Sequence, residues 1–229
     1  MSIVSHFKYL IKQNKLLYYP IKKYNSFKKQ AAIKRFHKNG YSINEDVYKA
    51  ISAEYFYCCS FGTLLGIIRE RGYITYDDDL DYFLKIDNDN IPVFNETMVR
   101  NGFKLVHVYK DKDIVREMGY VKKGISVDFF RLFPQDESHD RIFLFYRNRN
   151  RRYENKEVST TTCDLESINQ IEIEIINNSH FCLPANYEKV LVALYGQDWR
   201  TPKRGVKAGT IVGNRINNDD IISYMYRTL

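Results

Sequence analysis

Residues 76–83 read Tyr76-Asp77-Asp78-Asp79-Leu80-Asp81-Tyr82-Phe83, and no other stretch of the chain constrains the fold as strongly. Successive side chains of a β-strand point to opposite faces, so a strand here directs Asp79 and Asp81 to one face and Leu80 and Tyr82 to the other. Two carboxylates at neighbouring positions of one face repel each other unless a cation lies between them. Carboxylate oxygens suit Mg²⁺ or Mn²⁺. The stretch therefore predicts a metal site on a largely buried strand.

A calcium loop and a solvated acidic turn are the two alternatives for this stretch. An EF-hand loop that began at Asp77 would need glycine at position 82 and glutamate at position 88, and it is excluded because Tyr82 and Asn88 stand there. A solvated turn is disfavoured because the surrounding apolar residues predict burial, and buried carboxylates need partners. These apolar residues are Ile74, Tyr76, Leu80, Tyr82, Phe83 and Leu84.

Upstream, Gly62-Thr63-Leu64-Leu65-Gly66 joins a predicted strand to a predicted helix. The first turn of a helix offers free N–H groups, so Gly62 and Thr63 are expected to bind phosphate, and the glycine lets a phosphate approach the backbone. No Gly-Lys-Ser/Thr follows, so this is not a Walker loop. Arg69, about two turns later, is expected either to bind a phosphate oxygen or to form a surface ion pair.

Downstream, Ser126-Val127-Asp128-Phe129-Phe130 places one acid inside an apolar strand. A lone acid in such a strand predicts a third metal ligand or a general base, and a capping or turn acid is the alternative.

Composition predicts a folded domain that attracts polyanions. The chain has 229 residues, of which 44% are hydrophobic, and a formal net charge of +7. A basic surface attracts nucleic acid, nucleotides, acidic glycans or anionic lipid headgroups. The four cysteines form no Cys-x-x-Cys pair, which disfavours a zinc or redox site and predicts buried thiols in a reducing cytoplasm.

Residues 1–42 are predicted to be a basic helical extension, and residues 43–229 the catalytic domain. Apolar residues at 3, 7, 10 and 11 fall at helical spacing, so the extension either lies on anionic lipid or packs on the core. Pro20 is expected to end its first helix. The sequence has neither the long apolar run of a membrane span nor a signal peptide, which predicts a cytoplasmic protein with possible peripheral contact at the inner face of the plasma membrane.

The remaining pattern predicts an α+β fold. Helices are expected at 43–53, 63–69, 92–102 and 186–195, and strands at 54–61, 73–85, 103–108, 117–122, 125–132 and 172–176. The basic run at 147–152 is expected to be a solvated face or loop.

Together these motifs resemble the LicD family and the catalytic domain of fukutin and fukutin-related protein. The matching stretches are FGTLLGIIRERGYITYDDDLDYFL (61–84), SVDFFRLFP (126–134) and LPANYEKVLVALYGQDWRTP (183–202). The resemblance implies a nucleotidyltransferase-like fold with a small mixed β-sheet flanked by helices. It also implies that Asp79, Asp81 and Asp128 are metal ligands. The family tends to have tryptophan where Tyr76 stands, a departure that leaves the carboxylates intact.

The resemblance further implies the reaction. Family members are similar to enzymes that move a phospho-alcohol from a CDP- or CMP-activated donor to a glycan hydroxyl and release CMP. In that chemistry Mg²⁺ or Mn²⁺ holds the donor diphosphate, and Asp128 or Asp77 takes the acceptor proton. Tyr195 and Trp199 either stack on a base or sugar or pack a helix end. The expected acceptor is a bacterial cell-surface glycan, free or lipid-linked.

Three other functions stay open at this point. A nucleotidyltransferase would use the same metal site but release pyrophosphate. A basic nucleic-acid-binding protein without catalysis is disfavoured, because Asp79 and Asp81 would repel phosphate in the absence of metal. A non-catalytic family member is disfavoured because all three carboxylates are present.

Overall fold

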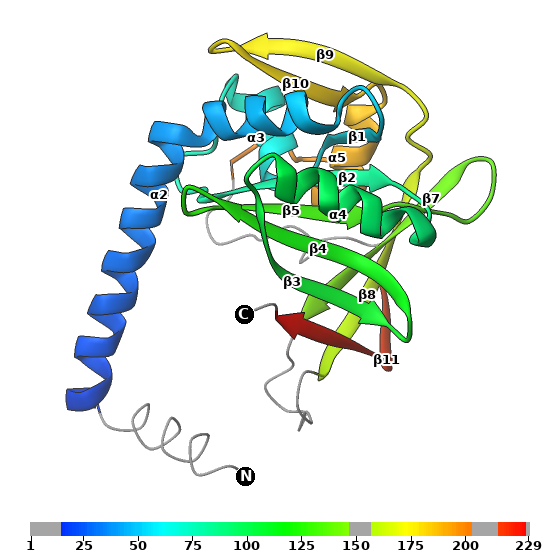
Figure 1. Cartoon of the computed structure of the whole chain (residues 1–229). Coiled ribbons are helices and arrows are strands. Elements are labelled where there is room, and N and C mark those ends of the chain that lie inside the picture. Colours follow the sequence, from blue (N-terminus) through cyan, green and yellow to red (C-terminus); the bar gives the residue numbers. More distant parts are fainter. Residues whose placement is uncertain (1–14, 147–156, 203–214, 228–229) are drawn as a thin grey trace.

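A nine-stranded β-sheet with helices on both faces forms the body of the protein (Figure 1). The computed structural model describes residues 15–146, 157–202 and 215–227. The strands of the large sheet follow the order β1-β2-β5-β4-β3-β11-β8-β7-β6, and β9 and β10 form a separate two-stranded ribbon. The predicted α+β class is confirmed, although the sheet is larger than the small one expected.

The described helices are α2 (Lys15–Ile51), α3 (Phe61–Glu70), α4 (Ile91–Arg100) and α5 (Tyr187–Tyr195), with a short 3₁₀ turn η1 (Asn88–Asn90). The strands are β1 (Phe56–Cys59), β2 (Asp79–Lys85), β3 (Lys104–Asp111), β4 (Ile114–Lys122), β5 (Ile125–Arg131), β6 (Phe133–Pro134), β7 (His139–Tyr146), β8 (Glu157–Glu166), β9 (Ile171–Ile176), β10 (Ser179–Pro184) and β11 (Arg215–Arg227). Among these strands, β2 and β5 pair in parallel and the other pairings are antiparallel.

The two faces of the sheet are covered by different helices around β2 and β5. On one face the rings of Tyr82 and Phe129 stack, and Phe94 of α4 packs edge-on against Phe129. On the other face Phe61 of α3 contacts Phe83 and Phe130. Because side chains alternate along a strand, Asp79, Asp81 and Asp128 share the face of α3.

Helix α2 runs without interruption from Lys15 to Ile51 and bends as it reaches the body of the protein (Figure 1). The expected helix end at Pro20 is therefore wrong, and the separate helix expected at 43–53 is the last part of α2. A proline removes one backbone hydrogen bond, which does not stop a helix that its other bonds support. Gly40 serves close packing instead: a Cβ there would lie 2.8 Å from a ring carbon of Tyr73. Ile3, Phe7, Leu10 and Ile11 lie outside the described residues.

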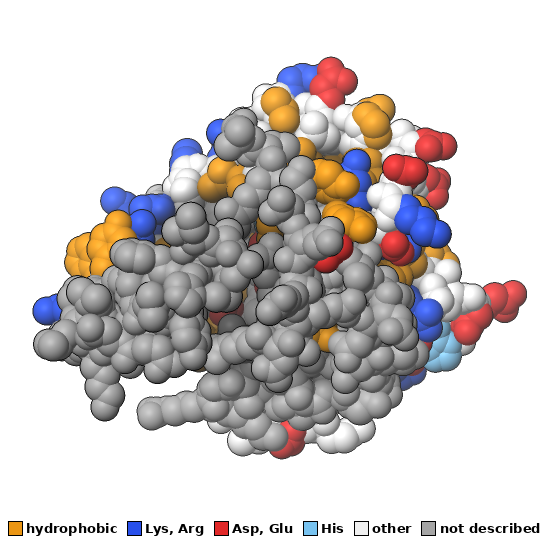
Figure 2. All heavy atoms as spheres, turned by 90° about the horizontal axis from the view of Figure 1, so that it is seen from below, with side chains coloured by type: hydrophobic (Ala, Val, Ile, Leu, Met, Phe, Trp, Pro, Cys, Tyr) orange, Lys and Arg blue, Asp and Glu red, His pale blue; other side chains and the backbone are white. Residues whose placement is uncertain are grey.

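The two halves of α2 have different surroundings. Asn44, which is buried, donates to the Ser179 hydroxyl at 2.6 Å and accepts from the Tyr82 hydroxyl at 2.7 Å, tying the second half to β10 and β2. In the first half Tyr24 and Phe27 are 57% and 71% exposed. Figure 2 shows basic and apolar side chains together at the left edge, where this half of α2 projects.

The acidic stretch starts its strand later than expected. Residues 73–78 form a turn, closed by a hydrogen bond from the Asp77 N–H to the Ile74 carbonyl at 3.0 Å, and β2 begins only at Asp79. Leu80 is fully buried as predicted, whereas Tyr76 is 55% exposed and its expected burial is wrong. Because Tyr76 lies in this turn and not in β2, the alternation of buried and exposed side chains along the strand does not apply to it.

Strands β7, β8, β10 and β11 were not expected from the sequence. The basic run at 147–152 lies outside the described residues. All four cysteines are free and buried, as predicted. None of the helices in the described ranges has both the length and the apolar run needed to cross a membrane.

Candidate active site

Three carboxylates meet where β2 and β5 run side by side. Asp81 and Asp128 are direct partners in the parallel register, and Asp79 lies one same-face position before Asp81. Their carboxylate oxygens, one from each residue, lie within 4.8 Å of one another. The metal-ligand group that the sequence predicted is therefore brought together by one pair of neighbouring strands.

The start of α3 holds β2 in position beside this group. The Asp81 N–H donates to the Thr63 hydroxyl at 2.9 Å, and the Ser60 N–H donates to the Asp81 carbonyl at 3.0 Å. Phe61 has φ = 38°, a left-handed conformation that non-glycine residues seldom adopt outside constrained sites. The turn from β1 into α3 thus fixes the backbone of Asp81, and Thr63, which was expected to contact phosphate, is buried and bonded to that backbone.

Burial and the charges of neighbouring acids raise the pKa of each of the three carboxylates. Burial, followed by the charge of Asp78, raises the pKa of Asp79 to about 6. Burial, followed by the charge of Glu117, raises the pKa of Asp128 to about 8. The pKa of Asp81 is raised well above its usual range by burial and then by Asp79. A positive ion placed among them would reverse these shifts.

Asp77 lies beside Gly62 at the edge of the same group. A Cβ added to Gly62 would lie 2.7 Å from an Asp77 carboxylate oxygen, so the glycine makes room for this acid. Burial and then Asp79 raise the pKa of Asp77 to about 7, while Lys29 of α2 lowers it. Helix α2 therefore brings a positive charge near the acids, which the sequence did not predict.

Three other predicted site residues lie near the far end of α3. Arg69 is held by the Glu70 carboxylate at 2.7 Å and donates to the Trp199 carbonyl at 3.4 Å, so it forms the expected ion pair. Trp199 is only 4% exposed and belongs to the core. Tyr195 is partly buried, and burial followed by the charge of Asp81 raises its pKa.

Two residues that the sequence analysis missed extend the acidic group. His107 of β3 lies 3.1 Å from a Glu117 carboxylate oxygen of β4 and 3.8 Å from Asp128 Oδ1. Both residues stand at the ends of strands that the sequence predicted. Polar side chains on such strands are a weak signal, and the sequence does not give the register that joins them to Asp128.

The donor set fits a divalent cation. Asp128 Oδ1 is buried and has no hydrogen-bond partner among the described residues. None of the lysines or arginines in the described ranges forms an ion pair with Asp79, Asp81 or Asp128. A buried carboxylate oxygen without a partner is costly, and a hard cation would satisfy it.

Comparison with known proteins identifies a family. A family model described as LicD/FKTN/FKRP, nucleotidyltransferase domain, matches residues 54–173, just over half of the chain, from the turn before β1 to β9. No curated protein matches the chain. The match includes Asp77, Asp79, Asp81 and Asp128, and it ends before Tyr195 and Trp199. The chain therefore belongs to the LicD/FKTN/FKRP family, whose members are transferases of phosphorus-containing groups that modify glycans.

Proposed function

We propose that this protein transfers a phospho-alcohol from a CDP- or CMP-activated donor to a hydroxyl group of a cell-surface glycan and releases CMP. The observation that carries the proposal is the group of Asp79, Asp81 and Asp128, whose oxygens converge within 4.8 Å and which forms no ion pair with a lysine or arginine of the described residues. A diphosphate donor is an anion, and such a group binds it only through a metal ion. Family membership supports the phosphorus chemistry.

Asp79, Asp81 and Asp128 would hold Mg²⁺ or Mn²⁺. When bound, the ion supplies charge neutralisation for the donor diphosphate and for the departing CMP. Backbone N–H groups at the start of α3, next to Gly62, are suited to contact a phosphate oxygen, since the first turn of a helix has unpaired donors. Tyr195 is suited to contact the donor because its hydroxyl, whose pKa is raised by burial, is also acted on by the charges of Asp81 and Asp77, which raise that pKa further.

The chemical step follows from the positions of the remaining carboxylates. The acceptor hydroxyl oxygen forms a bond to the phosphorus nearer the alcohol, and the bond from that phosphorus to the CMP oxygen breaks. CMP leaves with the bonding electron pair, and the hydroxyl proton passes to a carboxylate. Asp77 suits this last role because it lies at the edge of the group, outside the three clustered ligands.

The first experiment measures melting temperature with CDP-, UDP-, GDP- and CMP-linked compounds, each with and without Mg²⁺. A ligand that binds only the native state raises the melting temperature. A metal-dependent rise with one CDP-alcohol, followed by CMP release in the presence of a glycan, supports the proposal. Metal-independent binding, or none to any cytidine compound, would contradict it.

The alternative is a nucleotidyltransferase that moves a nucleoside monophosphate. The same three carboxylates serve both reactions, so the products decide between them. Release of pyrophosphate from a nucleoside triphosphate, with no CMP from any CDP-alcohol, would favour this alternative.

The proposal includes peripheral binding of the enzyme to an anionic membrane, where a lipid-linked acceptor would be found. The exposed half of α2 carries Tyr24 and Phe27 among lysines, and the Lys28 ammonium lies 4.6 Å from the Tyr24 ring. Replacing Tyr24 and Phe27 with serine should reduce co-sedimentation with phosphatidylserine vesicles. A matched control replaces Val93 and Val99, which are exposed on α4, and should leave binding unchanged. Equal losses in the two variants would contradict the membrane assignment.

A further inference from the structure

A single row of paired residues crosses four strands of the sheet. Asp81 of β2 pairs with Asp128 of β5, Asp128 pairs with Gly119 of β4, and Gly119 pairs with His107 of β3. Residues paired in register point to the same face of a sheet. Along this row, the face that carries the acids presents two carboxylates, then the position of Gly119, which has no side chain, and then the imidazole of His107.

The absence of a side chain at Gly119 allows the imidazole to approach the acids. A Cβ on Gly119 would lie 2.0 Å from His107 Cε1 and 2.5 Å from each ring nitrogen. No side chain larger than hydrogen is compatible with that contact, so the ring lies directly over β4. The backbone of Gly119 does not adopt a positive φ, so its conformation would accept other residues. Glycine is needed at this position because of the space that the His107 ring occupies.

Over β4 the imidazole meets two carboxylates from different strands. His107 Nε2 lies 3.1 Å from Glu117 Oε1 and 3.8 Å from Asp128 Oδ1, and the three donor atoms lie within 4.8 Å of one another. Glu117 is only 6% exposed. The 3.8 Å separation is too long for a hydrogen bond. Asp128 Oδ1 is buried without a hydrogen-bond partner among the described residues, although it faces the imidazole.

We propose that His107, Glu117 and Asp128 form a second metal site, which binds a transition-metal dication such as Mn²⁺ or Zn²⁺, and that Asp128 bridges it to the site of Asp79 and Asp81. One imidazole nitrogen with two carboxylate oxygens is a ligand set for these ions, whereas Mg²⁺ and Ca²⁺ prefer oxygen alone. The inference shares Asp128 with the proposed function but requires neither the donor nor the acceptor. A bridging carboxylate between two ions is the arrangement by which two-metal enzymes hold both oxygens of an in-line displacement.

The test is a Mn²⁺ titration of the full-length, tag-free protein, read by electron paramagnetic resonance. Pulsed spectra detect a directly coordinated imidazole through coupling to its nitrogen. We expect two ions per chain, one of them with nitrogen coupling. His107→Gln should abolish the coupling and weaken that site at least about tenfold, while the other ion stays bound. Gly119→Ala should have the same effect, because the added Cβ displaces the ring.

Two further variants separate this inference from the proposed function. Asp79→Asn should weaken the oxygen-only site and keep the nitrogen coupling. His180→Gln is the matched control, since His180 also pairs with a glutamate, Glu45, at 2.9 Å, but no third metal-ligating side chain joins this pair among the described residues. It should leave both ions in place.

Mn²⁺ binding without nitrogen coupling in the wild-type protein overturns the second site and leaves the proposed function intact. Coupling that persists in His107→Gln also overturns it. Failure of the wild-type protein to bind any Mn²⁺ or Mg²⁺ overturns both. The wild-type spectrum alone is decisive if a variant fails to fold.

Discussion

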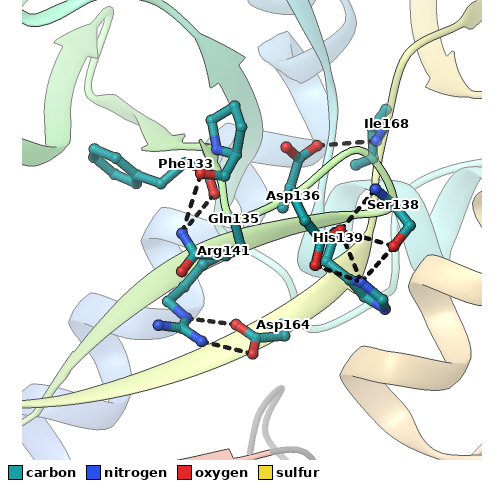
Figure 3. Close-up of polar contacts among 10 residues, drawn as sticks. Phe133, Gln135, Asp136, Ser138, His139, Arg141, Asp164 and Ile168 are labelled. Atoms are coloured by element: carbon teal, nitrogen blue, oxygen red, sulfur yellow. Dashed lines mark hydrogen bonds and ion pairs between the residues drawn. The ribbon is translucent and has the colours of Figure 1, made fainter.

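Acidic side chains at two places in the same sheet have contrasting partners. On β7 and β8 the chain supplies its own cations: Asp164 accepts two hydrogen bonds from Arg141, at 2.6 and 2.8 Å, as Figure 3 shows. Asp140, which is fully buried, lies 3.1 Å from the Lys85 ammonium. On β2 and β5, neither Asp79 nor Asp128 forms an ion pair with a lysine or arginine in the described part of the chain, and Asp128 Oδ1 has no hydrogen-bond partner there.

The pKa values differ in the same direction as the partners. The hydrogen bond from Arg141 lowers the pKa of Asp164, and hydrogen bonds from Ser138 lower the pKa of Asp136 to about 2. Burial raises the pKa of Asp79 and Asp128 to about 6 and about 8. Acids paired within the chain stabilise the fold, and acids gathered without partners are suited to a cation from outside. Four changes test this contrast.

The largest effect is expected at the unpartnered acids. Asp79→Ala or Asp81→Ala should lower CMP release by at least about a thousandfold, because the metal and donor lose their ligands. When both proteins are unfolded in EDTA, the alanine variant should be no less stable than the wild-type protein, since the substitution removes one of several carboxylates that repel one another. The control is Asp164→Asn, which should keep full activity. Normal turnover in either alanine variant would remove these residues from the site.

The second change tests a partnered acid. Asp140→Ala breaks the pair with Lys85 and removes the acceptor of the Ile168 N–H at 3.0 Å. Breaking a buried pair costs about 3 kcal/mol, the low end of the usual range because Lys85 is 25% exposed. Urea unfolding measures the loss. A destabilisation below about 1 kcal/mol would mean that this pair is not structural.

The third change is pH. Asp79 and Asp128 have folded-state pKa values above the unfolded value, so between about pH 4 and pH 8 the native state binds more protons than the unfolded state. Metal-free protein should therefore lose stability as pH rises through about 6 to 8, by at least about 1 kcal/mol. Mg²⁺ should restore it. A metal-free melting temperature that rises over this interval would contradict the raised pKa values.

Asp164 should behave in the opposite way, with a smaller effect. Its folded-state pKa is lowered, so its contribution is present above the unfolded value of about 3.9 and is lost as pH falls further. At pH 7 a double-mutant cycle of Arg141→Gln and Asp164→Asn should give a coupling of about 0.5 kcal/mol, because both side chains are about a third exposed. A coupling of zero would mean that this surface pair contributes nothing.

The sequence predicted where the candidate site residues lie better than it predicted the sheet. Alternation along one strand was enough to place Asp79 and Asp81 on one face, and an acid in an apolar strand was enough to single out Asp128. The pairing of β2 with β5 is non-local and depends on which strands become neighbours. For the same reason His107 and Glu117 could not be assigned: their nearness to Asp128 depends on the register across Gly119.

The failures at other elements also have local causes. Helix α2 continues through Pro20 and Gly40, since hydrogen bonds and packing outweigh the breaking tendency of single residues. Tyr76 lies in a turn where period-two alternation does not apply. Trp199 packs in the core, as the motif alone allowed. Strand β11 pairs with β3 and β8, which are distant in the sequence, and local sequence patterns do not encode such pairing.

The position of β5 between β2 and β4 has a consequence for the order of folding. Asp128 belongs to both ligand groups, so neither group is complete in a chain whose β5 has not docked. A nascent chain that has exposed only residues 76–83 would hold a cation weakly, and the docking of one strand would create both sites in a single step. Metal affinity would then report the insertion of β5, and amide hydrogen exchange along this strand should slow when the ion binds.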